Sequence, residues 1–100
     1  MGRFDVFRLN AKVPLVVEVQ ADLLSDLAST VVIPLLPEAK ASKTPVANLN
    51  PSIRVAGVEY RLLTDYIATL PRIRLGTYVV SINDQSSVIM NAVDFLLQGF

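Results

Sequence analysis

The chain has 100 residues with no break in composition, 52% of them hydrophobic, so we expect one domain over residues 1–100. Nine basic residues balance nine acidic ones, which leaves no overall field to attract nucleic acid or an anionic membrane. Because cysteine and histidine are absent, disulfides, thiol nucleophiles, common zinc sites and the usual neutral-pH general base are excluded, and we expect no metal or other cofactor.

The first third of the chain has the pattern of β-strands. An apolar and aromatic segment over residues 4–9 predicts a first strand. Apolar side chains alternate over 15–20, which predicts a second strand paired with the first as a hairpin. Residues 22–29 mix polar and apolar side chains and form either a helical turn or a loop, in which we expect Leu23 and Leu24 to be exposed.

The middle of the chain contains the strongest hairpin signal. Residues 31–33 are all β-branched and predict a buried strand, which we expect Pro34 to end because proline has no ladder donor. The proline-rich segment 34–51 is the least regular part of the chain, with room for one short peripheral strand. Alternation then resumes over 53–62 around a tight turn at Ala56-Gly57.

Further short extended segments precede the C-terminal end. Residues 66–70, closed by Pro71, predict one strand, and 72–75 and 78–80 supply the last extended segments. Five to seven short strands followed by one helix predict a mainly β fold, either a small antiparallel barrel or a strongly bent sheet.

Residues 83–100 are the segment with a helical period. Apolar residues recur there at spacings of one, three and four, as expected for one face of a helix. These are Val88, Ile89, Ala92, Val93, Leu96 and Leu97. Asn83 or Asp84 can cap the start of the helix, and Gly99 suits its end because glycine readily adopts a positive φ.

The end of this helix has more apolar groups than one face can hold. A terminal helix usually packs on its own sheet, but Phe95, Leu96 and Leu97 are consecutive and Phe100 follows them. We expect an apolar tip that the domain cannot cover itself, and hence a partner site. The high hydrophobic fraction favours a homodimer.

Charged residues provide no clear catalytic arrangement. The spacing of Glu18, Asp22 and Asp65 does not require them to converge, and solvated positions are the better interpretation for each. Arg72 and Arg74, two apart on a predicted strand, would point the same way and could bind a phosphate or carboxylate, although a solvated face is again favoured. We predict a binding protein and not an enzyme.

The chain also lacks the segments that direct proteins to membranes. Its N-terminus begins no hydrophobic signal sequence, and the longest uncharged apolar run, 31–36, is far too short to span a bilayer. We expect a soluble, cytoplasmic protein without a membrane partner.

Six stretches, in order and spacing, make the chain resemble the CcdB toxins of bacterial toxin-antitoxin pairs. They are Phe4–Phe7, Val16–Asp22, Val32–Leu35, Tyr60–Thr64, Ala68–Pro71 and Ile89–Phe100. The resemblance implies a homodimeric SH3-like barrel with a C-terminal helix. It further implies a toxin that binds the DNA gyrase A subunit, traps gyrase on cleaved DNA and so blocks replication. A CcdA-like antitoxin would neutralise it through a disordered segment, in a system that serves plasmid maintenance, with operator DNA bound only together with antitoxin.

The resemblance also implies the binding residues. In the family the last three residues, typically Trp-Gly-Ile, contact gyrase. The corresponding gyrase-binding positions, with those around them, are Gln98, Gly99, Phe100, Leu97, Asp94, Leu23 and Leu24. The implied antitoxin-binding positions are Leu23, Leu24, Asp94 and Leu97. Gln98 replaces the tryptophan, Leu23 and Leu24 replace two isoleucines, and Asp94 stands where asparagine is usual.

Two other interpretations stay open. The replacement at Gln98 is compatible with a CcdB-like protein that has lost gyrase poisoning and instead binds antitoxin or regulates its own operon. Ribonuclease toxins share a related barrel, so an endoribonuclease that works with arginines and carboxylates is a third possibility, by fold analogy alone.

Overall fold

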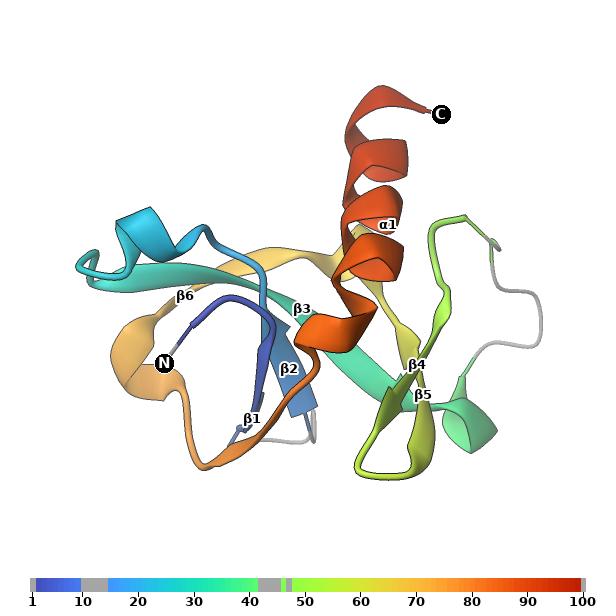
Figure 1. Cartoon of the computed structure of the whole chain (residues 1–100), viewed down its shortest axis with the longest axis horizontal. Coiled ribbons are helices and arrows are strands. Elements are labelled where there is room, and N and C mark those ends of the chain that lie inside the picture. Colours follow the sequence, from blue (N-terminus) through green and yellow to red (C-terminus); the bar gives the residue numbers. More distant parts are fainter. Residues whose placement is uncertain (1, 10–14, 42–45, 47, 100) are drawn as a thin grey trace.

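The computed structural model describes residues 2–9, 15–41, 46 and 48–99. Within them, seven strands form one antiparallel sheet that curls into a half-barrel, with a single α-helix at its C-terminal end (Figure 1). The strands are β1 (Asp5–Arg8), β2 (Leu15–Glu18), β3 (Ser29–Pro37), β4 (Ser52–Val55), β5 (Val58–Leu62), β6 (Ala68–Pro71) and β7 (Tyr78–Ser81), and the helix is α1 (Ser86–Gln98). The predicted mainly β fold with a C-terminal helix is confirmed.

Five short 3₁₀ helices connect these elements within the described residues. They are η1 (Asp22–Leu24), η2 (Glu38–Lys40), η3 (Thr64–Tyr66), η4 (Arg72–Arg74) and η5 (Asn83–Gln85). Residues 22–29 were predicted to form either a helical turn or a loop, and the segment begins with the helical turn η1. In the proline-rich segment no strand follows Pro37 before β4 among the described residues, so the short peripheral strand is not found there.

The sheet runs in the order β4-β5-β3-β2-β1-β7, and β6 pairs with β3 outside this path. β1 and β2 form the predicted hairpin, with Val6 opposite Val17. All four residues of β2 are buried, because a second small cluster covers the face opposite the main core. This cluster is formed by Phe7, Val16 and Val32.

β3 does not end at Pro34, so that prediction is wrong. The strand has nine residues and Pro34 lies opposite Val16 of β2. On its other edge β3 pairs with β6 over Ser29–Val32 and with β5 over Leu35–Pro37. Pro34 falls between these two pairings, where a missing N–H costs little, while its carbonyl accepts a hydrogen bond from the Leu63 N–H at 3.0 Å.

The β4–β5 hairpin turns at Ala56-Gly57, as predicted. Both residues have a positive φ, +50° at Ala56 and +82° at Gly57, which is the signature of the two-residue turn that matches strand twist. Glycine adopts this conformation without strain, whereas a left-handed alanine costs about 1–2 kcal/mol. Ala56 is thus a local weakness of the fold.

We therefore expect Ala56→Asn to raise the free energy of unfolding by about 0.5–1 kcal/mol, because asparagine is preferred at this turn position. Urea denaturation followed by circular dichroism measures the change. Ala41→Asn is the matched control, because Ala41 has an ordinary φ of −77°. Equal effects of the two substitutions would contradict this explanation.

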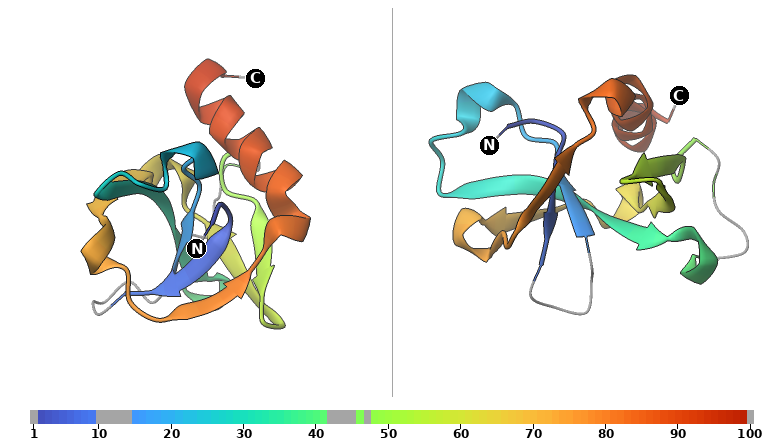
Figure 2. Two further views of the ribbon diagram at one scale, coloured as in Figure 1. Left: turned by 60° about the vertical axis from the view of Figure 1, so that its left-hand side comes forward. Right: turned by 60° about the horizontal axis from the view of Figure 1, so that its bottom comes forward.

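α1 packs on the main core with residues of its first two turns, the last of which is Val93. Ile89 and Ala92 are buried in the main core, and the helix then projects beyond the sheet (Figures 1 and 2). The predicted caps Asn83 and Asp84 are wrong, since they lie in η5 and α1 has no side-chain cap at its start. The predicted end is confirmed: Gly99 has φ +79° and donates to the Phe95 carbonyl at 2.8 Å.

Candidate functional site: the protruding end of α1 and the η1 surface

The last turn of α1 presents exposed groups to solvent. Leu97 is 75% exposed, and Gln98, Gly99 and Asp94 are exposed as well. Phe95 and Leu96 are half-buried, which agrees with apolar groups covering more than one face of this turn. The predicted site residue Phe100 lies outside the described residues.

A second apolar surface forms around η1. Leu23 is 96% exposed and Leu24 47%, as expected, and Leu27 beside them is half-exposed. The sequence pattern did not single out Leu27, although its spacing of three and four from the other leucines was a usable signal. We call these three leucines the η1 surface. It is held by Gln20, whose amide donates to the Leu24 carbonyl at 3.2 Å.

Arg3 links η1 to α1. Its backbone N–H donates to the Asp22 carboxylate at 2.6 Å, and its side chain reaches Met90 of α1, with 3.3 Å between Nη2 and the sulfur. η1 and α1 rise on the same side of the sheet in all three views (Figures 1 and 2). Sequence pattern gave no indication of this role for Arg3. Arg3 contacts Met90, which lies two turns before the tip of α1. The helix tip and the η1 surface, the two predicted parts of the site, therefore lie on the same side of the molecule but are not joined into one surface by this contact.

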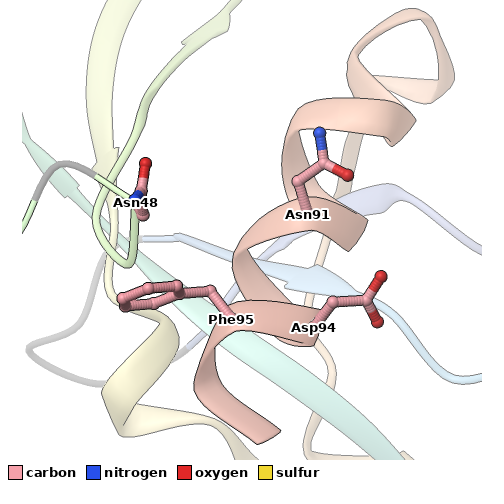
Figure 3. A pocket seen from close by; sticks show the side chains of 4 residues that line it. All are labelled: Asn48, Asn91, Asp94 and Phe95. Atoms are coloured by element: carbon pink, nitrogen blue, oxygen red, sulfur yellow. The ribbon is translucent and has the colours of Figure 1, made fainter. Parts of the chain in front are cut away.

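A groove of about 320 Å³ runs beside the helix below its tip. Asn48, Asn91, Asp94 and Phe95 line it. In Figure 3 the Phe95 ring points toward Asn48, while Asn91 and Asp94 project from another side of the helix. Of the predicted site residues, this groove includes Asp94, and it combines a carboxylate and two amides with an aromatic ring.

Glu18 is not solvated, contrary to the prediction. It is 3% exposed, and its Oε2 accepts hydrogen bonds from Thr30 Oγ1 at 2.6 Å and from Arg72 Nη1 at 2.9 Å. Arg72 Nε also donates to the Leu27 carbonyl at 3.1 Å. The pair therefore fastens η4 and the η1 surface to the sheet. Asp22 and Asp65 are exposed as predicted, and these two and Glu18 do not gather into one group.

Arg72 and Arg74 do not form the predicted pair on one strand face. They lie in η4, where three residues complete a turn, so positions two apart point in different directions. Arg72 turns inward to Glu18 and Arg74 is exposed. The two arginines therefore do not form a shared anion-binding site.

Residues 2–9, 15–41, 46 and 48–99 contain neither a metal-ligating cluster nor a membrane-spanning helix. Among them, no three metal-ligating side chains gather closely enough to hold an ion. No helix in this part of the chain combines the length and hydropathy needed to cross a membrane.

Comparisons with known proteins find one matching family and similar solved structures. A protein-family profile described as "CcdB protein" matches residues 3–99. The structure is similar to an "Endoribonuclease in complex with its cognate antitoxin from Mycobacterial species", with 17% identity, a TM-score of 0.77, and coverage of 97% of this chain and 94% of that one. An "Endoribonuclease from Mycobacterial species" has the same identity and TM-score, with 97% and 90% coverage. At 17% identity these likenesses show the fold alone. No curated protein sequence matches the chain.

Proposed function

The chain belongs to the CcdB family, and on that premise we propose that it is the toxin of a toxin-antitoxin pair. It binds the A subunit of DNA gyrase, traps the gyrase-DNA cleavage complex and blocks replication. A CcdA-like antitoxin neutralises it by covering the same surface. The pair acts in the cytoplasm and serves plasmid maintenance.

The observation that supports this proposal is the uncovered apolar end of α1. Leu97 and Gln98 stand on the last helical turn, clear of the sheet, and Gly99 follows with its backbone exposed. Solvated apolar groups on a protruding element favour association, because burial against a partner removes them from water. A protruding tip can enter a recess on a larger protein.

Binding, not catalysis, accounts for the activity in this proposal. Two described carboxylates contact both a hydroxyl and a guanidinium: Glu18, with Thr30 and Arg72, and Glu38, with Ser52 and Arg61. Glu18 is buried and so closed to a nucleic-acid phosphate, and Glu38 occupies the guanidinium that would have to bind such a phosphate beside it. We propose that the protein is not an enzyme and needs no cofactor.

We also propose a homodimer. Large apolar side chains remain exposed on several elements of the single chain, including Tyr66 after β5, Val88 of α1 and Tyr78 of β7, and a second copy can cover part of this surface. A sedimentation-equilibrium mass of 10.9 kDa at micromolar concentration, that of one chain, would contradict the dimer.

Incubation with gyrase, ATP and supercoiled plasmid tests the proposed function. We expect linear DNA after detergent and protease treatment. Gln98→Trp restores the residue usual in the family, and a buried indole anchor contributes about 2 kcal/mol or more. This variant should therefore form the same product at roughly thirtyfold lower concentration.

A second candidate function is favoured by Gln98, whose exposed amide replaces the aromatic anchor. Under this second function the protein keeps the family fold and still binds antitoxin, but it has lost gyrase poisoning. Together with antitoxin it binds operator DNA and represses its own operon. Linear DNA with Gln98→Trp but none with the native chain would favour this function. No linear DNA from either protein would refute gyrase poisoning, and cleavage of bulk RNA by the pure protein would point to an endoribonuclease.

A further inference from the structure

The groove beside α1 contains a carboxylate that has no cationic partner within the described part of the chain. Among those residues three ion pairs form, none of which includes Asp94. They are Arg54–Glu59, Arg61–Glu38 and Arg72–Glu18. The other lining residues in the described part of the chain, Asn48, Asn91 and Phe95, are uncharged.

The lining fits one kind of group. The Asp94 carboxylate and the amide oxygen of Asn91, which project from the same side of the helix (Figure 3), can accept hydrogen bonds from a guanidinium or an ammonium. The Phe95 ring offers an apolar surface for the methylene stem of such a side chain, and an aromatic face that attracts a cation. A basic side chain therefore suits the groove better than an acidic or a purely apolar one.

The size and position of the groove favour an extended chain as the source of this side chain. A volume of about 320 Å³ admits one or two side chains and not the surface of a folded domain. Asp94 lies one turn before the exposed Leu97 and Gln98, so a segment that covers the tip and continues along the helix passes this groove. Disordered segments that fold on binding can follow such a path.

We propose that the groove receives an arginine or lysine side chain of the neutralising antitoxin, and that Asp94 selects antitoxins with a basic residue at that point. This inference rests on the proposed function. Asp94 is then a specificity-determining residue of the toxin, acting through its carboxylate. Charge complementarity of this kind changes partner choice and association rate more than total affinity.

The test is a titration of the native chain, Asp94→Asn and Asp94→Lys with the purified antitoxin encoded beside the toxin gene, at 50 and 300 mM salt. We expect Asp94→Asn to weaken binding by about fivefold at low salt and Asp94→Lys by more, because an exposed or half-buried ion pair is lost or reversed. The differences should shrink at high salt. Asp84→Asn removes an exposed carboxylate outside the groove and should leave affinity unchanged.

The outcomes separate this inference from the proposed function. No binding by the native chain would refute the antitoxin partner itself. Native affinity retained by Asp94→Asn, or equal losses for Asp94→Asn and Asp84→Asn, would overturn the groove assignment alone. A loss confined to gyrase binding would also overturn it. Substituting each basic residue of the antitoxin by glutamine should identify one position at which Asp94→Asn has no further effect.

Discussion

Arg72→Ala should lower the free energy of unfolding by about 3–5 kcal/mol, because it leaves the Glu18 carboxylate buried without its cation. Glu18 has 4% and Arg72 18% of its side chain exposed, so water cannot replace the guanidinium. For a domain whose total stability is about 5–15 kcal/mol, the loss is a large fraction. Urea denaturation monitored by circular dichroism measures it.

Arg54→Ala is the matched control for this change. Arg54 pairs with Glu59 at 2.9 Å, but its side chain is 69% exposed, and surface pairs contribute only about 0–1 kcal/mol. The double variant Glu18→Met with Arg72→Met should recover most of the lost stability, because it removes both buried charges together. If Arg72→Ala cost no more than Arg54→Ala, the buried pair would not stabilise the fold as described.

Deletion of residues 98–100 should abolish growth inhibition in cells that express the protein without antitoxin. Interfaces depend on a few anchoring residues, and loss of about 2 kcal/mol or more at such a centre weakens binding by roughly thirtyfold or more. The deletion removes Gln98 and Gly99 from the protruding end of α1. Colony counts after induction, compared with the full chain, measure the effect.

The fold provides the control for this deletion. Gln98 and Gly99 are exposed, and the buried helix residues Ile89 and Ala92 lie at least one turn before them. The shortened protein should therefore keep its circular dichroism spectrum and its unfolding midpoint within a few degrees. If the shortened, folded protein remained as toxic as the full chain, the helix tip would not be the gyrase contact.

Local patterns in the sequence were sufficient for most elements of the fold. The period of residues 88–97 and the left-handed preference of Gly99 predicted α1 and its end, and strand alternation around Ala56-Gly57 predicted the β4–β5 hairpin. These signals work because helix periodicity and tight turns depend on neighbouring residues. Pro34 was misjudged because its tolerance depends on two different strands that meet β3 on either side of it.

The candidate site was predicted in part. The exposure of Leu97 followed from apolar groups that one helix face could not hold, and that of Leu23 and Leu24 from their place in a segment of mixed polar and apolar residues. The Glu18–Arg72 pair joins residues 54 positions apart, and no local pattern indicates such a contact. The groove at Asp94 likewise needs Asn48 from a distant turn, so only the folded chain reveals it.

The length of β3 has a further consequence for recognition. The strand begins two residues after Leu27 and pairs at its other end with β5, and Gln85 at the foot of α1 bonds the neighbouring β4 at Arg54. Nine strand residues span roughly 30 Å, so β3 fixes the position of the η1 surface relative to the β4–β5 hairpin, which holds the foot of α1. A folded partner that touches both the η1 surface and α1 must match their fixed arrangement, whereas a flexible chain needs only enough length. The proposed target and the proposed antitoxin would thus meet different geometric demands on the same protein.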